Sequence, residues 1–211
     1  MEETTLHGPT YRIVSHGMTG MHKLNAVEWL KWAAIKITRA SRQEDKRMIS
    51  NWVIDLFIAA KWAFVIGAWR FNLTGRPIIW ISIYLLIANI FTYFWHHLWL
   101  PRAPAYAADN PHRERRRFLN LLSAMAFSMA TYAFFYSRVF TNSFDWPHDI
   151  VAPVAALTFS VGNALTGATG DLHPKTSAAY LLMTSQLVMT FVFVAMLLST
   201  SIPLQKHGKE E

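Results

Sequence analysis

The sequence predicts an all-α membrane protein with four transmembrane helices and a re-entrant helix and loop between the third and the fourth, preceded by an N-terminal amphipathic interfacial helix. Hydrophobic residues make up 53% of the 211 residues, and the mean hydropathy is positive at +0.19 although charged segments flank the apolar part. Four apolar segments are each near the ~20 residues that a helix needs to cross a bilayer. They run about 49–69, 78–100, 118–140 and 176–200.

Polar segments between these spans divide the chain into five parts. We expect a cytoplasmic N-terminal region, a two-helix membrane hairpin, a basic cytoplasmic linker, a membrane domain built from the last two spans, and a short cytoplasmic tail, at residues 1–48, 49–100, 101–117, 118–200 and 201–211. Residues 1–20 show no periodicity, and we expect them either to be disordered or to lie against the rest of the protein. The chain contains no cysteine, which excludes disulfides, thiolate metal sites and cysteine nucleophiles.

An amphipathic helix is predicted to begin at Leu24. Apolar residues recur there at three- and four-residue spacing, at Leu24, Val27, Leu30, Ala34 and Ile37. Trp29 and Trp32 suit a headgroup boundary, and neighbouring cations are supplied by Lys23, Lys31, Lys36 and Arg39. This pattern favours an interfacial helix that lies along a membrane surface. A solvated helix that packs on a cytoplasmic partner is the alternative.

The distribution of cations predicts how the chain is oriented. With a cytoplasmic N-terminus, eight Lys or Arg in residues 1–49, five in 101–117 and two in the tail lie inside. The cations outside are then Arg70, Arg76, Arg138 and Lys175. The positive-inside rule therefore places both termini in the cytoplasm. Because the net charge of +7 is a topology signal, we do not expect the chain to bind nucleic acid directly.

The segment from Leu157 to Pro174 has the composition of a re-entrant loop that opens outward. Its first half is apolar enough to enter a membrane. It then breaks into Thr166-Gly167-Ala168-Thr169-Gly170, which is too rich in glycine and threonine to continue a helix. The exit is polar and is closed by Pro174, and a long apolar helix follows. Irregular backbone of this kind survives at membrane depth only where protein buries it or water wets it.

With its flanking spans, this segment resembles the pore domain of the tetrameric potassium-channel superfamily. Thr166-Gly167-Ala168-Thr169-Gly170-Asp171-Leu172-His173-Pro174 aligns without a gap on that family's filter, T-V-G-Y-G-D-x-x-P, and Phe159-Ser160 matches the pore helix. The resemblance covers residues 118–200, and the two preceding spans make the chain similar to small four-span bacterial members. It implies a homotetramer in a bacterial inner membrane, in which four loops present rings of carbonyl oxygens that replace an ion's hydration shell.

The filter-like residues depart from the family pattern at three positions. Ala168 replaces a glycine, and a Cβ in a left-handed conformation costs roughly 1–2 kcal/mol per residue. Gly167 replaces a β-branched valine, which loosens the loop. Thr169 replaces the tyrosine that reaches a tryptophan cuff in the family, and residues 155–158 supply no tryptophan. The sequence therefore predicts the pore fold without a potassium-selective filter.

Two functions follow from the resemblance. The first is a homotetrameric cation pore of relaxed selectivity, with a monovalent cation held by the filter-like residues Thr166, Gly167, Ala168, Thr169, Gly170 and Asp171. Asp145, Asp149 and Asp171 would concentrate cations near its outer mouth. The second is a non-conducting or conditional tetrameric membrane scaffold or sensor that recruits a soluble cytoplasmic partner protein, for example in a bacterial defence or stress system. Neither function calls for a cofactor.

The last span carries a candidate pore-lining stripe. Its residues follow helical spacing: Met183, Gln186, Thr190, Phe193 and Leu197. Gln186 and Thr190 are predicted to hydrate an ion in the cavity, and Phe193 with Leu197 to form an apolar gate that closes by dewetting. Ordinary helix–helix packing, with Thr184 and Ser185 bonding across neighbouring helices, is the alternative.

Charged residues mark two further candidate sites. The first span contains Asp55 and Lys61, which are expensive in lipid. They are six residues apart and do not share a helix face, so each is expected to pair with another helix or a turn. The basic linker is predicted to contact anionic lipid or a partner protein through Arg113, Arg115, Arg116 and Arg117.

Histidines provide no metal site in this sequence. His96 and His97 are adjacent on a helix and point about 100° apart, so they do not chelate one ion. His173, at the outer mouth, is a candidate for gating by protonation near neutral pH. We expect no enzyme, because no Ser/His/Asp grouping, P-loop or dinucleotide fingerprint occurs.

Overall fold

The computed structural model is mostly helical and contains four helices that are long and apolar enough to span a membrane. It describes residues 8–39, 41–95, 99, 111–146, 152–166 and 172–201. The candidate spans are Gln43–Arg70, Arg76–Phe94, Phe118–Val139 and Ser177–Leu198, which confirms the four segments predicted from the sequence. The chain divides into two compact units, Met1–Phe64 and Val65–Glu211, with the boundary inside the first span.

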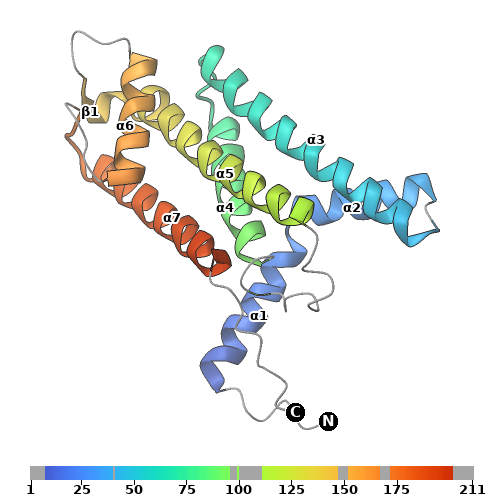
Figure 1. Ribbon diagram of the computed structural model, residues 1–211. Helices are drawn as coiled ribbons and strands as arrows, with labels where there is room; N and C mark the ends of the chain where they lie inside the picture. The colour runs from blue at the N-terminus through green and yellow to red at the C-terminus, as the bar shows by residue number, and fades with distance from the viewer. Residues whose placement is uncertain are drawn as a thin grey trace. The chain divides into compact units, whose positions relative to one another are not determined.

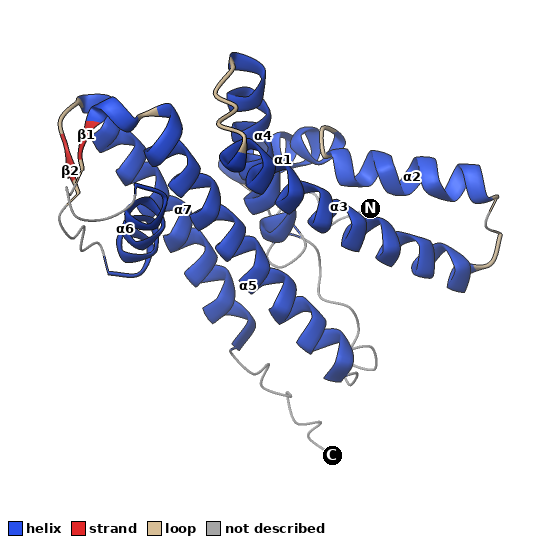
Figure 2. Ribbon diagram, turned by 90° about the horizontal axis from the view of Figure 1, so that it is seen from above, coloured by secondary structure: helices blue, strands red, loops and turns tan. Residues whose placement is uncertain are grey.

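The first unit contains α1 (Pro9–Lys23), α2 (Ala26–Thr38) and most of α3 (Gln43–Arg70). The sequence of residues 1–20 shows no periodicity, yet residues 9–20 belong to α1. Pro9 occupies the first turn of α1, where its fixed φ favours a helix and its missing N–H is not needed, and neither Gly17 nor Gly20 ends the helix. Asn25 caps α2 by accepting a hydrogen bond from Val27 N at 3.1 Å. Figure 2 shows α2 running beside the first part of α3.

A tight turn joins the end of α3 to α4 (Arg76–Phe94). Asn72 adopts a left-handed φ of 53°, and Leu73 N donates to Ala68 O at 2.9 Å. This is a Schellman ending, in which asparagine takes the left-handed position that glycine usually fills. Gly75 is the N-cap of α4 and a proline lies in its first turn, so the second span begins directly after this turn.

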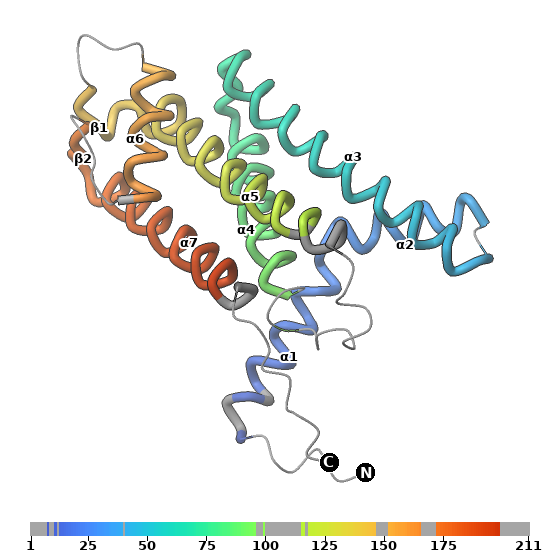
Figure 3. Tube along the Cα trace, in the orientation of Figure 1, coloured from blue at the N-terminus to red at the C-terminus, as the bar shows by residue number. Residues whose placement is uncertain are grey.

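The rest of the second unit consists of α5 (Pro111–Phe134), a π-helical turn (Phe135–Val139), a 3-10 turn (Thr141–Ser143), α6 (Ala152–Thr166) and α7 (Ser177–Ser201). Figure 1 shows α6 as the short helix that lies beside α5 and α7. Two short strands flank α6 in the chain: β1 (Phe144–Asp145) precedes it and β2 (His173–Pro174) follows it. They pair antiparallel, with Phe144 opposite Pro174 and Asp145 opposite His173 (Figure 3).

Aromatic residues of α5 form the core of this unit. Phe127 and Phe134 are 0% exposed. The larger of two apolar clusters surrounds the end of α5 and includes Phe144, Phe159 and Leu172. The smaller cluster joins Leu121 and Ala124 of α5 to Phe193 and Met196 of α7. Helices α6 and α7 both pack against α5, so α5 is the helix on which they are assembled.

Candidate functional site

Helix α6 ends near the middle of the two long helices beside it. Ser160 Oγ donates to Met129 O of α5 at 2.7 Å, and Asn163 Nδ2 donates to Met183 O of α7 at 3.2 Å. Met129 lies midway along the Phe118–Val139 span, and Met183 lies in the first half of the Ser177–Leu198 span. The pairing of β1 with β2 brings together the two ends of the intervening chain, residues 146–172.

Four fully buried side chains, Tyr136, Ser160, Asn163 and Gln186, form a hydrogen-bonded polar cluster around the end of α6. Gln186 Oε1 accepts from Tyr136 Oη at 2.6 Å and from Asn163 Nδ2 at 2.9 Å. Gln186 Nε2 donates to Ser160 O at 2.8 Å and to Ser160 Oγ at 2.7 Å. Both ends of the Gln186 amide are therefore satisfied, and the polar cluster ties α5, α6 and α7 together.

Tyr136 reaches the polar cluster from the π-helical turn. Phe140 N donates to Phe135 O at 2.8 Å, so one additional residue is accommodated in this turn. The Tyr136 ring lies edge-to-face on Phe144 and Phe159, with centroids 5.2 and 4.9 Å away. Sequence reasoning missed this tyrosine because apolar periodicity does not reveal a π turn. A tyrosine hydroxyl inside an apolar span, which needs a partner when buried, is the signal that identifies it.

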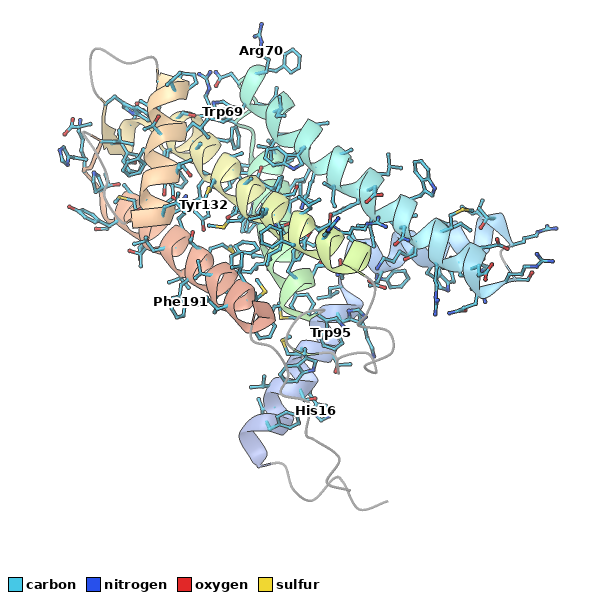
Figure 4. The ribbon with its side chains drawn as sticks, viewed as in Figure 1. His16, Trp69, Arg70, Trp95, Tyr132 and Phe191 are labelled. Carbon is cyan, nitrogen blue, oxygen red and sulfur yellow. The ribbon has the colours of Figure 1, made fainter. Side chains whose placement is uncertain are left out.

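A second hydroxyl pair lies one turn earlier on α5. Tyr132 Oη and Ser185 Oγ are 3.0 Å apart, and Ser185 Oγ also donates to Leu182 O at 2.7 Å. This contact fulfils the alternative expectation that Ser185 bonds across to a neighbouring helix. The Tyr132–Ser185 contact adds a further polar contact between α5 and α7, outside the four-residue cluster (Tyr132 is labelled in Figure 4).

The filter-like residues begin where α6 ends. Thr166 is the last residue of α6, and Gly167, Ala168, Thr169, Gly170 and Asp171 lie outside the described residues. Leu172, which follows them, is 3% exposed and belongs to the larger apolar cluster. The loop is thus anchored at both flanks, by the polar cluster before it and by the aromatic core after it.

Three of the five residues in the candidate pore-lining stripe face the interior of the unit. Gln186, Thr190 and Phe193 are 1%, 8% and 1% exposed. Leu197 packs partly against the smaller apolar cluster. These three side chains are buried within the subunit, and their assignment as pore-lining residues stays a prediction. Helical spacing identifies which residues share a face, but a polar side chain in an apolar helix is stabilised by protein neighbours as well as by water.

The opposite face of α7 is exposed and mostly apolar. Phe191 is 73% exposed, and Figure 4 shows it pointing away from α7 and from the helices behind it. Thr184 supplies a hydroxyl on this face. We define the outward stripe of α7 by five exposed residues at helical spacing: Leu181, Thr184, Val188, Phe191 and Ala195.

The predicted acidic outer mouth is only partly described. Asp145 forms an ion pair with Lys175, and both side chains are exposed. The opposite charge of Lys175 reduces the attraction of this carboxylate for free cations. His173 is exposed opposite Asp145 in the strand pair, whereas Asp149 and Asp171 lie outside the described residues.

The charges of the first span lie on different faces of α3, as predicted. Asp55 is exposed and Lys61 is 4% exposed, and neither residue is without an interaction partner. In the basic linker, Arg115 is exposed and Arg116 is half-buried in the first turns of α5. The side chains of Arg113 and Arg117, and the pair His96 and His97, lie outside the described part of the chain.

Within the described ranges, no group of three or more His, Asp or Glu is arranged to hold a metal ion. Comparison of the chain with protein families, with curated proteins and with solved structures found no match. The resemblance of residues 118–200 to the potassium-channel superfamily therefore stays a prediction.

Proposed function

We propose that the chain is one subunit of a homotetrameric, channel-like membrane pore, lined by the filter-like loop and the outward stripe of α7. The observation that carries this proposal is the placement of α6. It is an apolar helix too short to cross a bilayer, held by buried hydrogen bonds near the middle of two helices that are long enough to cross. A chain that enters a membrane and leaves on the same side brings its flanks together, and the β1–β2 pairing fits that path.

The need for several copies follows from the filter-like loop. At membrane depth its backbone N–H and C=O groups require protein or water as partners. Four copies around an axis would supply a water-filled path for these groups. The apolar window of α7 is only 22% buried inside the chain, which leaves most of this helix for neighbouring subunits or lipid.

In this proposal, the polar cluster supports the filter-like loop in place of the aromatic cuff that the family uses. This sequence has neither the tyrosine nor the tryptophan of the family's cuff. Asn163, one helical turn before Thr166, is instead bonded to Gln186 and to Met183 O of α7. In this proposal, α7 sets the position of the loop through Gln186 and Asn163.

A non-conducting or conditional tetrameric scaffold or sensor is the second candidate, and the orientation of α7 favours it. Gln186 and Thr190 are buried within the subunit, which supports a candidate that does not need them to hydrate an axial cavity. Four Phe191 side chains around an axis would instead form an apolar constriction that excludes water. Such a pore conducts only when the outward stripes move apart.

Ion flux from liposomes separates the two candidates. The full chain in vesicles is expected to release both K⁺ and Na⁺ down their gradients, because the loop departs from a potassium-selective filter. Phe191→Ala should raise the rate by removing the apolar constriction. Phe118→Ala, at an exposed phenylalanine where the third span begins, is the matched control and should leave the rate unchanged. Vesicles that stay tight to both ions with the natural chain and with Phe191→Ala exclude the pore and leave the scaffold.

The tetramer is tested separately from conduction. Native mass spectrometry should find complexes of four 24.2 kDa chains. Because the chain has no cysteine, Thr184→Cys places a single thiol per subunit on the outward stripe, and oxidation should yield disulfide-linked dimers of subunits. Leu56→Cys, on an exposed position of α3, is the control and should remain uncoupled. Monomeric complexes, or equal coupling at both positions, would contradict the assembly.

A further inference from the structure

Helix α2 exposes most of its large apolar side chains, whereas its ion pair lies on a less exposed side. Trp29, Trp32 and Ile37 are 62%, 58% and 80% exposed. Glu28 and Lys31, in contrast, form an ion pair at 2.7 Å, with side chains 31% and 14% exposed. A helix on the surface of a soluble domain turns its apolar stripe toward the core and its charges toward water. The exposed face of α2 is therefore suited to an apolar environment.

Part of the exposed face forms a shallow, open groove. Its volume is about 520 Å³, and it is lined by Leu24, Ala26, Trp29, Leu30, Trp32 and Ala33. The rings of Trp29 and Trp32 meet edge-to-face with centroids 6.4 Å apart, and Trp29 Nε1 donates to Lys23 O at 2.6 Å. All lining residues belong to one helix and the turn before it. Such an open groove does not surround a small ligand, so it fits an extended apolar layer better.

Cations lie at both ends of this groove. Lys36 Nζ is 4.8 Å from the centroid of the Trp32 ring, and Lys23, whose carbonyl holds Trp29, is exposed at the other end. Arg39 and Arg42 follow in the exposed connector. Tryptophan next to lysine is the composition of a protein surface at the headgroup level of a bilayer, and the cations complement anionic headgroups.

The connection to α3 holds this groove close to a bilayer. Helix α2 ends at Thr38, and α3, a candidate membrane span, begins at Gln43. Fully extended, this connector reaches at most about 18 Å. Wherever α3 crosses a membrane, α2 therefore lies within reach of the membrane surface.

We infer that the exposed face of α2 binds the headgroup and upper acyl region of a bilayer leaflet containing anionic phospholipid. Trp29 and Trp32 lie at the boundary between headgroups and acyl chains, Leu30 and Ile37 reach below it, and Lys23 with Lys36 meets lipid phosphates. This face differs from the stripe predicted by spacing, because Val27 is 6% exposed and belongs to the inner side of α2. The inference is independent of whether the chain forms a pore.

Site-directed spin labelling of the full chain tests this inference. Leu30→Cys and Ile37→Cys each give a single thiol for a nitroxide, and Ser41→Cys in the exposed connector is the aqueous control. In vesicles of phosphatidylcholine mixed with phosphatidylglycerol, labels at Leu30→Cys and Ile37→Cys should be accessible to oxygen and protected from a water-soluble nickel chelate. The label at Ser41→Cys should show the opposite pattern.

Lys36→Gln tests whether anionic lipid contributes to the binding of α2. It should lower the ratio of inserted to water-exposed label at Ile37→Cys by about fivefold in the anionic vesicles, the factor for one lysine near such a surface. Lys175→Gln, an exposed lysine of the other unit, should leave the ratio unchanged. Equal insertion in phosphatidylcholine alone would overturn the anionic assignment. Labels open to the nickel chelate would overturn membrane binding, and labels shielded from both reagents would assign the face to a protein partner instead.

Discussion

Helices α3 and α5 are both long enough to cross a membrane, yet protein surrounds them to very different extents. Inside the chain, 50% of the apolar window of Phe118–Val139 is buried, against 17% of the window of Gln43–Arg70. Helix α5 packs against α4, α6 and α7, whereas α3 exposes Trp52, Leu56 and Ile66. Two helices of similar hydropathy therefore have different surroundings: α5 is part of a protein core, whereas most of the surface of α3 is available to contact lipid or another chain.

The largest expected effect contrasts one aromatic residue on each helix. Phe127→Ala removes a fully buried ring of α5 and should lower the free energy of unfolding by about 3–5 kcal/mol. Trp52→Ala, at a position of α3 that is 72% exposed, should change it by less than about 0.5 kcal/mol. The measurement is SDS-induced unfolding in mixed micelles, followed by the helical circular dichroism signal. Similar losses for both variants would show that α3 is as enclosed as α5.

A second contrast compares polar groups on the two faces of α7. Gln186→Leu should cost about 2–3 kcal/mol, since it leaves Tyr136 Oη and Asn163 Nδ2 without their short hydrogen bonds to Gln186 Oε1. Thr184→Val removes a hydroxyl of similar chemistry from the exposed stripe and should be nearly neutral. The same unfolding assay compares the two variants. A tolerated Gln186→Leu would mean that the polar cluster does not hold α6.

A smaller loss is expected from the hydroxyl of Tyr136 alone. Tyr136→Phe keeps the ring packing on Phe144 and Phe159 and leaves Asn163 to bond Gln186 Oε1, so the cost should be about 1 kcal/mol. Tyr180→Phe, at a tyrosine that is 59% exposed, is the matched control and should have no measurable effect. If Tyr136→Phe lowered the free energy of unfolding as much as Gln186→Leu does, the tyrosine hydroxyl alone would account for the stabilisation by the polar cluster.

The smallest expected effect concerns the ion pair across β1 and β2. Lys175→Met should reduce stability by at most about 1 kcal/mol, because Lys175 and Asp145 are both exposed and water screens their attraction. The loss should shrink further in high salt. Unfolding measured at low and high ionic strength checks both statements. A large, salt-independent loss would indicate that this pair is buried in the assembled protein.

The spans and the position of the short helix were predictable from the sequence. Runs of apolar residues and the break after Thr166 are strong signals, and six of the eight span boundaries lie within about two residues of those predicted. The second span ends at Phe94, six residues before the predicted end. The first span begins six residues earlier than predicted, at Gln43, because Gln43 and the residues after it favour a helix although they are too polar for the hydrocarbon core. Helix α1 was missed because its glycines obscured the periodicity.

The direction in which each helix face points was not predictable. Spacing grouped Gln186 with Thr190 and Phe193 correctly, but it did not reveal that Asn163, Ser160 and Tyr136 would meet that face. The same ambiguity affected α2, where the predicted stripe combined Val27 on the inner side with Leu30 and Ile37 on the outer side. In both helices, residues far away in the chain determine which face is buried and which is exposed.

A density map of the full chain in lipid nanodiscs tests the central claim most directly. The proposal expects fourfold symmetry, with Thr184 and Phe191 of each subunit facing the axis below the filter-like loop, and Gln186 buried against Asn163 within the subunit. A monomer, or an assembly in which the outward stripe of α7 faces lipid and the loop after Thr166 lies away from any axis, would contradict it.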